Sequence, residues 1–127
     1  MSRIKYGLVV ALFNAFPLPQ KSGFRSSFGF AGESADRGYS ILVFPEGGRT
    51  PDGRMQRFQA GTGILATNLN IPVVPVRIDG LYELKKEGKK FARPGAVTVT
   101  IGAPVRFQPK EEPADIAKDL ESRVAAL

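Results

Sequence analysis

Ile41-Leu-Val-Phe-Pro-Glu-Gly-Gly-Arg-Thr50 is the stretch on which the fold class of this chain depends. Its first four residues are apolar and stand between turn-forming residues, which predicts a short buried strand over 40–44. Pro45 has no N–H to give to a sheet and glycines follow, so we expect the strand to end near Phe44. In an α/β protein, the loop after a buried strand is a common ligand-binding position. This loop carries a carboxylate, backbone N–H groups and an arginine, which suit a phosphate-bearing ligand.

Helices are predicted where apolar residues recur at every third or fourth position. The pattern predicts a helix over 22–37, which Gly38 is placed to end, and another over 59–69, which ends before Asn70. A third helix, over 113–127, begins with a proline and is the most regular of the chain. Its apolar residues recur at spacings of four, four and three: Ile116, Leu120, Val124 and Leu127.

Strands are predicted where β-branched residues lie between turn formers. They cover 6–13, where a helix is the alternative, 73–78, where Pro75 predicts an interrupted strand or an edge strand, and 96–101. In 96–101, valine and isoleucine alternate with threonine, which predicts one buried face and one polar face. The resulting order is strand, helix, strand, helix, strand, strand, helix. It predicts an α/β domain with a partly parallel sheet flanked by helices.

The length and composition fit one soluble domain over 1–127, with 43% apolar and 24% charged residues and no internal repeat or linker. There is no cysteine, which excludes disulfides and thiolate nucleophiles and favours a cytoplasmic location. There is no histidine, the commonest general base and metal ligand near neutral pH, and Asp36, Asp52 and Asp79 are separated by loops, so no metal site is expected. No other cofactor is expected. The apolar run 7–16 is shorter than the roughly 20 residues of a membrane-spanning helix and has no signal-peptide cleavage site.

The chain is basic, with 18 Lys and Arg against 12 Asp and Glu, so its net charge is +6 and favours anionic partners. Between 85 and 93 there are five basic residues and a single acidic residue, Glu87. This cluster is either a solvated turn or a patch for anionic lipid head groups or coenzyme A phosphates. Nucleic acid is not an expected partner, because Phe91 is the only aromatic residue in the cluster. The basic residues of the cluster are Lys85, Lys86, Lys89, Lys90 and Arg93.

Residues 44–50, Phe-Pro-Glu-Gly-Gly-Arg-Thr, resemble the third sequence block of the glycerolipid acyltransferases of the 1-acylglycerol-3-phosphate acyltransferase type, Phe-Pro-Glu-Gly-Thr-Arg-Ser. Residues 71–76, Ile-Pro-Val-Val-Pro-Val, resemble the fourth block at the expected distance. Residues 13–20 lie where the second block belongs, with Gln20 where many members have an arginine. The resemblance extends from about 13 to 107 and implies a glycerol-phosphate-acyltransferase-type domain.

The resemblance also implies a reaction and a set of substrates. Members of the family transfer a fatty acyl group from acyl-CoA or acyl carrier protein to a lysophospholipid or glycerol phosphate in phospholipid biosynthesis. The substrate-binding residues that it implies here are Glu46, Gly47, Gly48, Arg49 and Thr50. Arg49 is expected to bind the acceptor phosphate, and Glu46 to orient Arg49 or a substrate hydroxyl.

The family's first block, a histidine and an aspartate separated by four residues, has no counterpart in a chain without histidine. In the family, that histidine is taken to deprotonate the acceptor hydroxyl. We therefore expect the C-terminal portion of an incomplete, N-terminally truncated acyltransferase domain, with no catalytic residue of its own and no activity alone. An incomplete sheet predicts self-association, and the substrates predict peripheral contact with the cytoplasmic membrane face. The alternative is a non-catalytic module that binds anionic lipid or another protein through 85–93.

Overall fold

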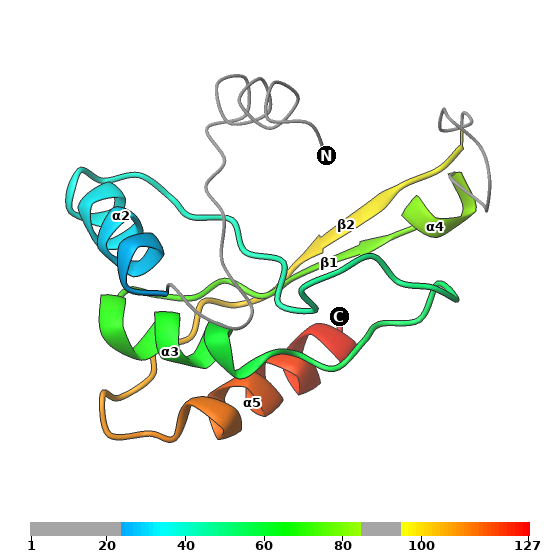
Figure 1. Cartoon of the computed structure of the whole chain (residues 1–127). Coiled ribbons are helices and arrows are strands. Elements are labelled where there is room, and N and C mark those ends of the chain that lie inside the picture. The colour runs from blue at the N-terminus through cyan, green and yellow to red at the C-terminus, as the bar shows by residue number, and fades with distance from the viewer. Residues whose placement is uncertain (1–23, 85–94) are drawn as a thin grey trace. The chain divides into compact units, whose positions relative to one another are not determined.

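The computed structural model describes residues 24–84 and 95–127 (Figure 1). The chain forms two compact units, Met1–Ile41 and Leu42–Leu127. In the described residues, the first unit contributes helix α2 (Phe24–Asp36). The second contains, in chain order, α3 (Ala60–Leu69), β1 (Val76–Asp79), α4 (Leu81–Leu84), β2 (Thr98–Ile101) and α5 (Pro113–Ala125). The strand predicted over 6–13 lies outside the described residues.

Helix α2 confirms the helix predicted over 22–37, and it ends at the glycine that the sequence marks. Gly38 has a φ of 82°, and its N–H donates to the carbonyl of Ala35 over 2.9 Å. The N–H of Tyr39 donates to the carbonyl of Ser34 over 3.0 Å. These bonds satisfy carbonyls of the last turn, which is why a residue that tolerates positive φ follows the helix.

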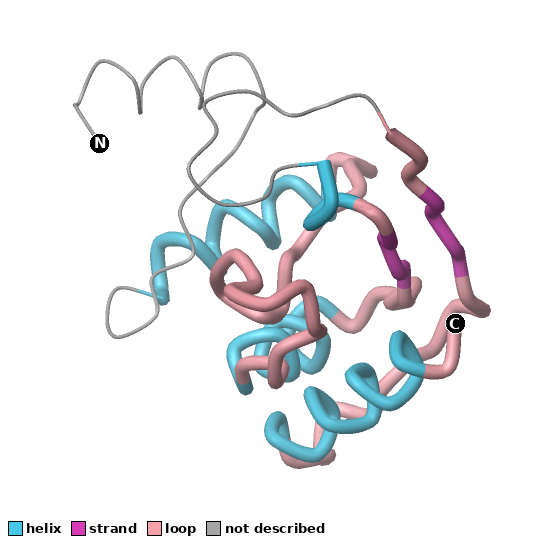
Figure 2. Tube along the Cα trace, turned by 90° about the vertical axis from the view of Figure 1, so that its right-hand side faces the viewer, coloured by secondary structure: helices cyan, strands magenta, loops and turns pink. Residues whose placement is uncertain are grey.

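Helices α3 and α5 lie side by side and form the core of the second unit (Figures 1 and 2). They confirm the helices predicted over 59–69 and 113–127, with Pro113 in the first turn of α5 and Asn70, in the left-handed conformation, at the end of α3. Three members of the predicted apolar stripe of α5 face this core, because Ile116 and Leu120 are buried and Val124 packs against the cluster. The fourth, Leu127, lies beyond the end of the helix at Ala125. The buried side chains of the core are Phe58, Ala66, Phe107, Ile116, Ala117 and Leu120.

Gly63 permits the close approach of the two helices. A Cβ atom added at Gly63 would lie 1.9 Å from the carbonyl oxygen of Pro113, at the start of α5. No side chain fits at that distance, since the neighbour is backbone that cannot rotate away. A glycine that weakens the helix locally is therefore required by its packing.

Strands β1 and β2 form a two-stranded antiparallel ribbon, with Val76 opposite Ile101 and Ile78 opposite Val99. Before β1, Val73 and Val105 exchange two backbone hydrogen bonds of 2.8 Å in an isolated bridge. This confirms the interruption that Pro75 predicts, because a proline cannot donate to the ladder. In the described residues, this ribbon is the only sheet, and its strands are antiparallel. The predicted partly parallel pairing is therefore wrong.

The predicted strand over 40–44 is also wrong. Residues 41–44 pair with no strand in the described ranges, and Leu42 and Phe44 are 75% and 67% exposed. An apolar run favours a strand only where a neighbouring strand supplies hydrogen-bond partners and a packed layer covers the face. Neither condition is met here in the described part of the chain.

The apolar face of 96–101 is exposed, contrary to prediction. Val99 is 55% and Ile101 69% exposed, and their cross-strand partners Val76 and Ile78 are exposed as well. On the other face, Arg77 reaches the end of α5. The alternation correctly predicts which residues share a face, but burial of that face requires a covering layer.

Candidate functional site

The site loop begins with a β-turn formed by residues 44–47. The N–H of Gly47 donates to the carbonyl of Phe44 over 3.2 Å, with Pro45 and Glu46 at the central positions. Proline has the φ that the first central position requires. Gly47 has a φ of 71°, in the left-handed region that favours glycine. The first glycine of the Gly-Gly pair is thus explained by the backbone of the turn.

Glu46 ties the loop to the segment that precedes α3. Its Oε2 accepts the N–H of Gln56 over 2.6 Å, in a partly buried position. Next to it, the carbonyl of Pro45 accepts the N–H of Gln59 over 2.8 Å. We expected Glu46 to orient Arg49 or a substrate hydroxyl. In the described residues its carboxylate accepts the backbone N–H of Gln56 and makes no hydrogen bond or ion pair with Arg49, and the contact with a substrate hydroxyl stays a prediction. Glu46 therefore fixes the base of the loop.

The base of the loop is joined in turn to the helix pair. The N–H of Phe58 donates to Oε2 of Glu121 on α5 over 2.9 Å, and the ring of Phe58 is part of the core. Glu121 is far from Phe58 in sequence, so this carboxylate links the loop to the helix by tertiary contact. The base of the loop is consequently held by both apolar packing and hydrogen bonds.

The outer part of the loop, residues 50–54, is a turn held by its own polar groups. Oδ1 of Asp52 accepts the N–H of Arg54 over 3.0 Å, and the hydroxyl of Thr50 donates to the carbonyl of Arg54 over 2.7 Å. The backbone N–H of Arg54 lowers the pKa of Asp52 below its ordinary value, because it stabilises the charged carboxylate. The Thr50 hydroxyl and the Arg54 charge act in the same direction, while desolvation opposes them.

Arg49 lies between the β-turn and this outer turn. Its side chain is exposed, and it makes no hydrogen bond or ion pair with any residue in 24–84 or 95–127. The side chains of Arg54 and Arg57 are likewise exposed and without an ion pair in these ranges. The Arg49 guanidinium thus has no carboxylate partner in the described residues and is available to an external anion, whereas the charge of Arg54 acts on the Asp52 carboxylate.

All the residues that the sequence indicates for substrate binding, from Glu46 to Thr50, belong to this loop. Asp52, Gln56 and Tyr82 also contact this loop, and the sequence did not indicate them as site residues. Pro-Asp-Gly over 51–53 is a turn signature that could have indicated Asp52. Tyr82 follows a strand later in the chain, and no local signal connects it with the loop. Its hydroxyl donates to the carbonyl of Pro51 over 3.3 Å.

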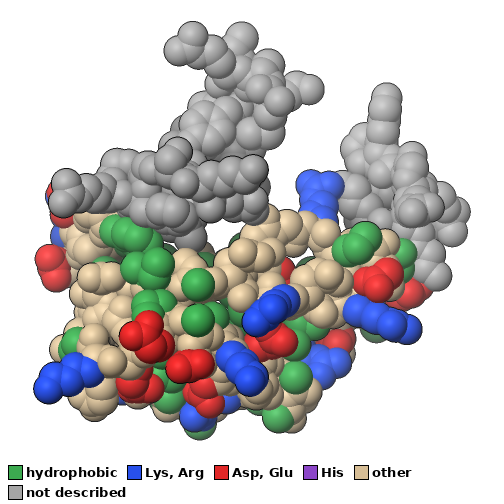
Figure 3. Space-filling view, turned by 60° about the horizontal axis from the view of Figure 1, so that its bottom comes forward, with side chains coloured by type: hydrophobic (Ala, Val, Ile, Leu, Met, Phe, Trp, Pro, Cys, Tyr) green, Lys and Arg blue, Asp and Glu red, His purple; other side chains and the backbone are tan. Residues whose placement is uncertain are grey.

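The charged side chains on the face that Figure 3 displays are of both signs. Figure 3 shows acidic and basic side chains interspersed on this face.

The part of the chain that the structure describes has no group of three or more acidic side chains placed to hold a metal ion. Nor does any of its helices have the length and apolar character needed to cross a bilayer.

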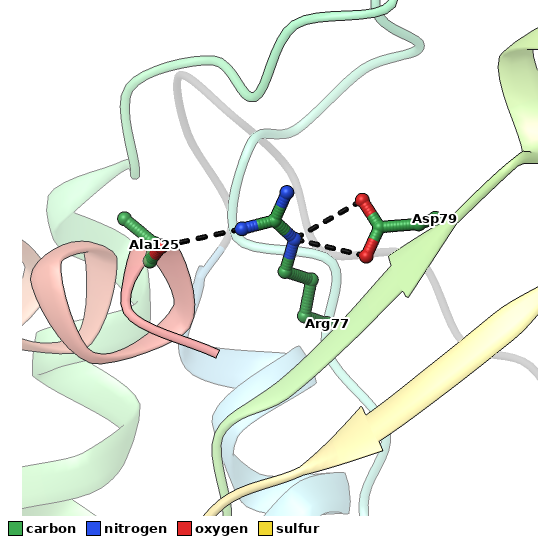
Figure 4. A network of polar contacts seen from close by, with 3 residues as sticks. All are labelled: Arg77, Asp79 and Ala125. Carbon is green, nitrogen blue, oxygen red and sulfur yellow. Dashed lines mark hydrogen bonds and ion pairs between the residues drawn. The ribbon is translucent and has the colours of Figure 1, made fainter.

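Arg77 forms a separate polar network that joins β1 to α5 (Figure 4). Its Nε lies 3.1 and 3.0 Å from the carboxylate oxygens of Asp79, and its Nη1 donates to the carbonyl of Ala125 over 3.2 Å. A cation at the end of a helix interacts favourably with the helix dipole and with its last carbonyl groups. Because the Arg77 guanidinium has partners within the protein, we assign it a structural role.

The comparisons with known proteins agree with the resemblance found in the sequence. The sequence model of the Acyltransferase family matches residues 8–79. The 1-acyl-sn-glycerol-3-phosphate acyltransferase of Pseudomonas aeruginosa is 38% identical over 95 residues, which cover 74% of this chain and 35% of that protein. The enzyme of the same name from Limnanthes alba is 33% identical over 70 residues, which cover 55% of this chain and 25% of that protein.

A solved structure shows the same similarity in three dimensions. The crystal structure of PlsC, the 1-acyl-sn-glycerophosphate (LPA) acyltransferase of Thermotoga maritima, matches with a TM-score of 0.67 and 31% sequence identity. The match covers 81% of this chain and 43% of that chain, so the sequence spans less than half of the related structure. The family match covers more than half of the present chain, and the chain therefore belongs to the Acyltransferase family.

Proposed function

We propose that loop 45–54 is the acceptor-phosphate site of an acyltransferase domain. In the complete reaction, the domain transfers a fatty acyl group from acyl-CoA or acyl carrier protein to a lysophospholipid or glycerol phosphate. The observation that carries the proposal is the exposed Arg49 side chain, which has no partner in the described residues and belongs to a loop fixed at its base. The names of the relatives support this choice of acceptor.

The chemistry of the loop suits a phosphate monoester. A guanidinium binds phosphate oxygens through two parallel N–H groups. Arg54 at the end of the loop and Arg57 in the segment before α3 add positive charge. Gly48 has open space where a Cβ would stand, so nothing from its own side chain obstructs a ligand that approaches the backbone. In this proposal, the fixed base of the loop reduces the conformational entropy that is lost when the ligand binds.

We assign no catalytic residue and propose that this chain alone does not transfer acyl groups. It contains no histidine, and the absence of a general base typically lowers rates by about 10²–10⁴-fold. Glu46 is a poor substitute, because an ordinary carboxylate is a weak base for an alcohol and one of its oxygens already accepts the N–H of Gln56. The loop therefore supplies binding, and the proton transfer needs a group from elsewhere.

Glycerol 3-phosphate titrated into ¹⁵N-labelled protein tests the binding site. We expect the amide signals of Gly47, Gly48 and Arg49 to shift. Arg49→Ala should weaken binding roughly 10- to 100-fold, because it removes charge-assisted hydrogen bonds. The matched control is Arg123→Ala, which removes the same charge from α5 and should leave affinity unchanged. Equal losses in both variants would contradict the assignment.

The same titration separates the site from the alternative module. Shifts confined to Lys89 and Lys90, which lie outside the described residues, would favour binding of anions through 85–93. We propose that the domain is cytoplasmic and contacts the membrane surface peripherally. Binding to liposomes with and without anionic lipid tests this contact. Binding that depends on anionic lipid and survives Arg49→Ala would assign the contact to the basic cluster.

An acyl-transfer assay tests the absence of activity. The protein is incubated with acyl-CoA and lysophosphatidic acid, and free thiol is measured against a heat-killed control. We expect no thiol above that control. Release that disappears in Arg49→Ala would show that the chain catalyses the reaction and would overturn this part of the proposal.

We also propose self-association through the exposed face of the ribbon. Its support is the exposure of Val76, Ile78, Val99 and Ile101 on one face. Such a face excludes water when a second copy covers it. Sedimentation at rising protein concentration should show a dimer, and Val99→Lys should shift the equilibrium to monomer. A wild-type monomer at all concentrations would contradict the proposal.

A further inference from the structure

Helix α4 (Leu81–Leu84) is placed by a tight turn after β1. Gly80 has a φ of 91°, and a Cβ at this position would lie 2.2 Å from the carbonyl oxygen of Ala96. Only glycine allows this conformation and this close approach to the backbone that leads into β2. The turn therefore fixes where the first residues of α4 lie. Leu81 and Glu83 are exposed, whereas Tyr82 between them is half-buried.

Tyr82 lies against the outer turn of the site loop. A Cβ added at Gly53 would be 2.8 Å from Cδ1 of Tyr82 and 3.0 Å from Cγ, so the ring packs on the glycine backbone. The Tyr82 hydroxyl donates to the carbonyl of Pro51 over 3.3 Å. Gly53 has a φ of 83°, which also disfavours a side chain at this position. The contact thus combines a ring face with a hydroxyl group on the same turn.

The outer turn has few other attachments to the rest of the unit. In the described residues, the hydrogen bonds of 50–54 come from Thr50, Asp52, Arg54 and Gln56, which all belong to the loop or its base. The hydroxyl of Tyr82 is the hydrogen-bonding group that reaches this turn from another element. Arg49 directly precedes this turn and follows Gly48, a residue that restricts the backbone little, so we expect the turn to influence the position of Arg49.

We infer that Tyr82 is a positioning residue that holds the outer turn, and through it Arg49, in the orientation that accepts phosphate. This inference rests on the function proposed for the loop. Tyr82 itself touches no substrate in this scheme. Its ring limits the conformations of the free loop, so less entropy is lost when Arg49 closes on the ligand. The segment that follows the fourth sequence block thereby acts on the third block, since β1 and the Gly80 turn carry Tyr82 to the loop.

The first test measures the loop without ligand. Amide relaxation by ¹⁵N NMR should show greater mobility at Arg49, Thr50 and Gly53 in Tyr82→Ala than in the wild type. Tyr82→Phe keeps the ring and should retain the wild-type pattern, because a 3.3 Å hydrogen bond is the weaker part of the contact. The matched control is Tyr39→Ala, which removes an exposed tyrosine from the first unit. Unchanged relaxation in Tyr82→Ala would overturn the inference.

The second test measures affinity for glycerol 3-phosphate in the same proteins. We expect binding to be roughly three- to tenfold weaker in Tyr82→Ala and close to wild type in Tyr82→Phe and Tyr39→Ala. Equal affinity in Tyr82→Ala and the wild type would also overturn the inference. If Tyr82→Ala fails to fold, as judged from the amide signals of α3 and α5, both measurements are made on Tyr82→Leu instead.

The two tests distinguish this inference from the proposed function. If the wild type does not bind glycerol 3-phosphate while Tyr82→Ala still loosens the turn, the phosphate site is wrong and the contact that orders the loop stands. If the wild type binds through Arg49 and Tyr82→Ala changes neither mobility nor affinity, the phosphate site stands and the role of Tyr82 is wrong.

Discussion

Helices α3 and α5 and the ribbon β1–β2 both carry clear apolar patterns, but they use them differently. Ile116 on α5 is 1% exposed, whereas Ile101 on β2 is 69% exposed. The helices bury their apolar residues against each other, because each provides the covering surface for its partner. The strands share one apolar face, and in the described residues that face remains open. A periodic pattern thus identifies a face, and only a second surface makes it a core.

The first prediction compares the same substitution in the two regions. Ile116→Ala should lower the free energy of unfolding by about 2–5 kcal/mol, because it leaves a cavity in the core. At protein concentrations low enough for the chain to be monomeric, Ile101→Ala should change it by less than about 0.5 kcal/mol, because the side chain is then in water. Urea unfolding followed by circular dichroism measures both. A large cost for Ile101→Ala that grows with protein concentration would show that a second copy covers the ribbon.

The second prediction concerns how closely the helices approach. Gly63→Ala should destabilise the protein by about 1–3 kcal/mol, because the new Cβ meets the backbone carbonyl of Pro113. Gly29→Ala is the control within α2, where no atom lies within 4 Å of the added Cβ. It should stabilise the helix by up to about 1 kcal/mol, since alanine favours helix more than glycine does. Thermal unfolding of both variants should give shifts of opposite sign, and similar shifts would contradict the packing.

The third prediction concerns the connection between the two regions. Arg77→Ala should cost about 0.5–1.5 kcal/mol, because it removes the hydrogen bond from β1 to the carbonyl of Ala125 as well as a half-exposed ion pair. Arg123→Ala removes an ion pair with Asp119 that lies within α5, and should cost about 0.3–0.5 kcal/mol. Urea unfolding at low and high salt separates the contributions. An equal cost for both variants would mean that the link to α5 adds nothing.

The smallest effect is expected in the outer turn of the loop, which is held by polar groups rather than by a core. The pKa of Asp52 is lowered from its ordinary value of 3.8, chiefly by the N–H of Arg54. The charged form therefore stabilises the turn above pH 3.8, and this stabilisation is lost as the pH falls through the lower folded value. The amide signal of Arg54 should follow that titration, and Asp52→Asn should abolish the step. A titration midpoint at or above 3.8 would contradict the hydrogen bond.

Much of the site and of the helical structure could be predicted because the signals are local. Pro113 and the spacing of Ile116 and Leu120 predict α5, and Gly38 and Asn70 correctly predict where α2 and α3 end. The sequence of residues 44–50, together with that of 71–76, indicates the family, and the match of the family model confirms it. These features depend on residues a few positions apart, whose backbone preferences and spacing do not require the rest of the chain.

What only the tertiary structure decided depends on partners that are distant in sequence. The sequence alone determined the helices, the turn residues and the family membership of the loop. The structure decided that residues 41–44 remain unpaired in the described part, that Glu46 holds the N–H of Gln56, and that Tyr82 packs on Gly53. The physical reason is that strand pairing, burial of a face and contact between a loop and a helix each need a second surface, and a local pattern does not specify that surface.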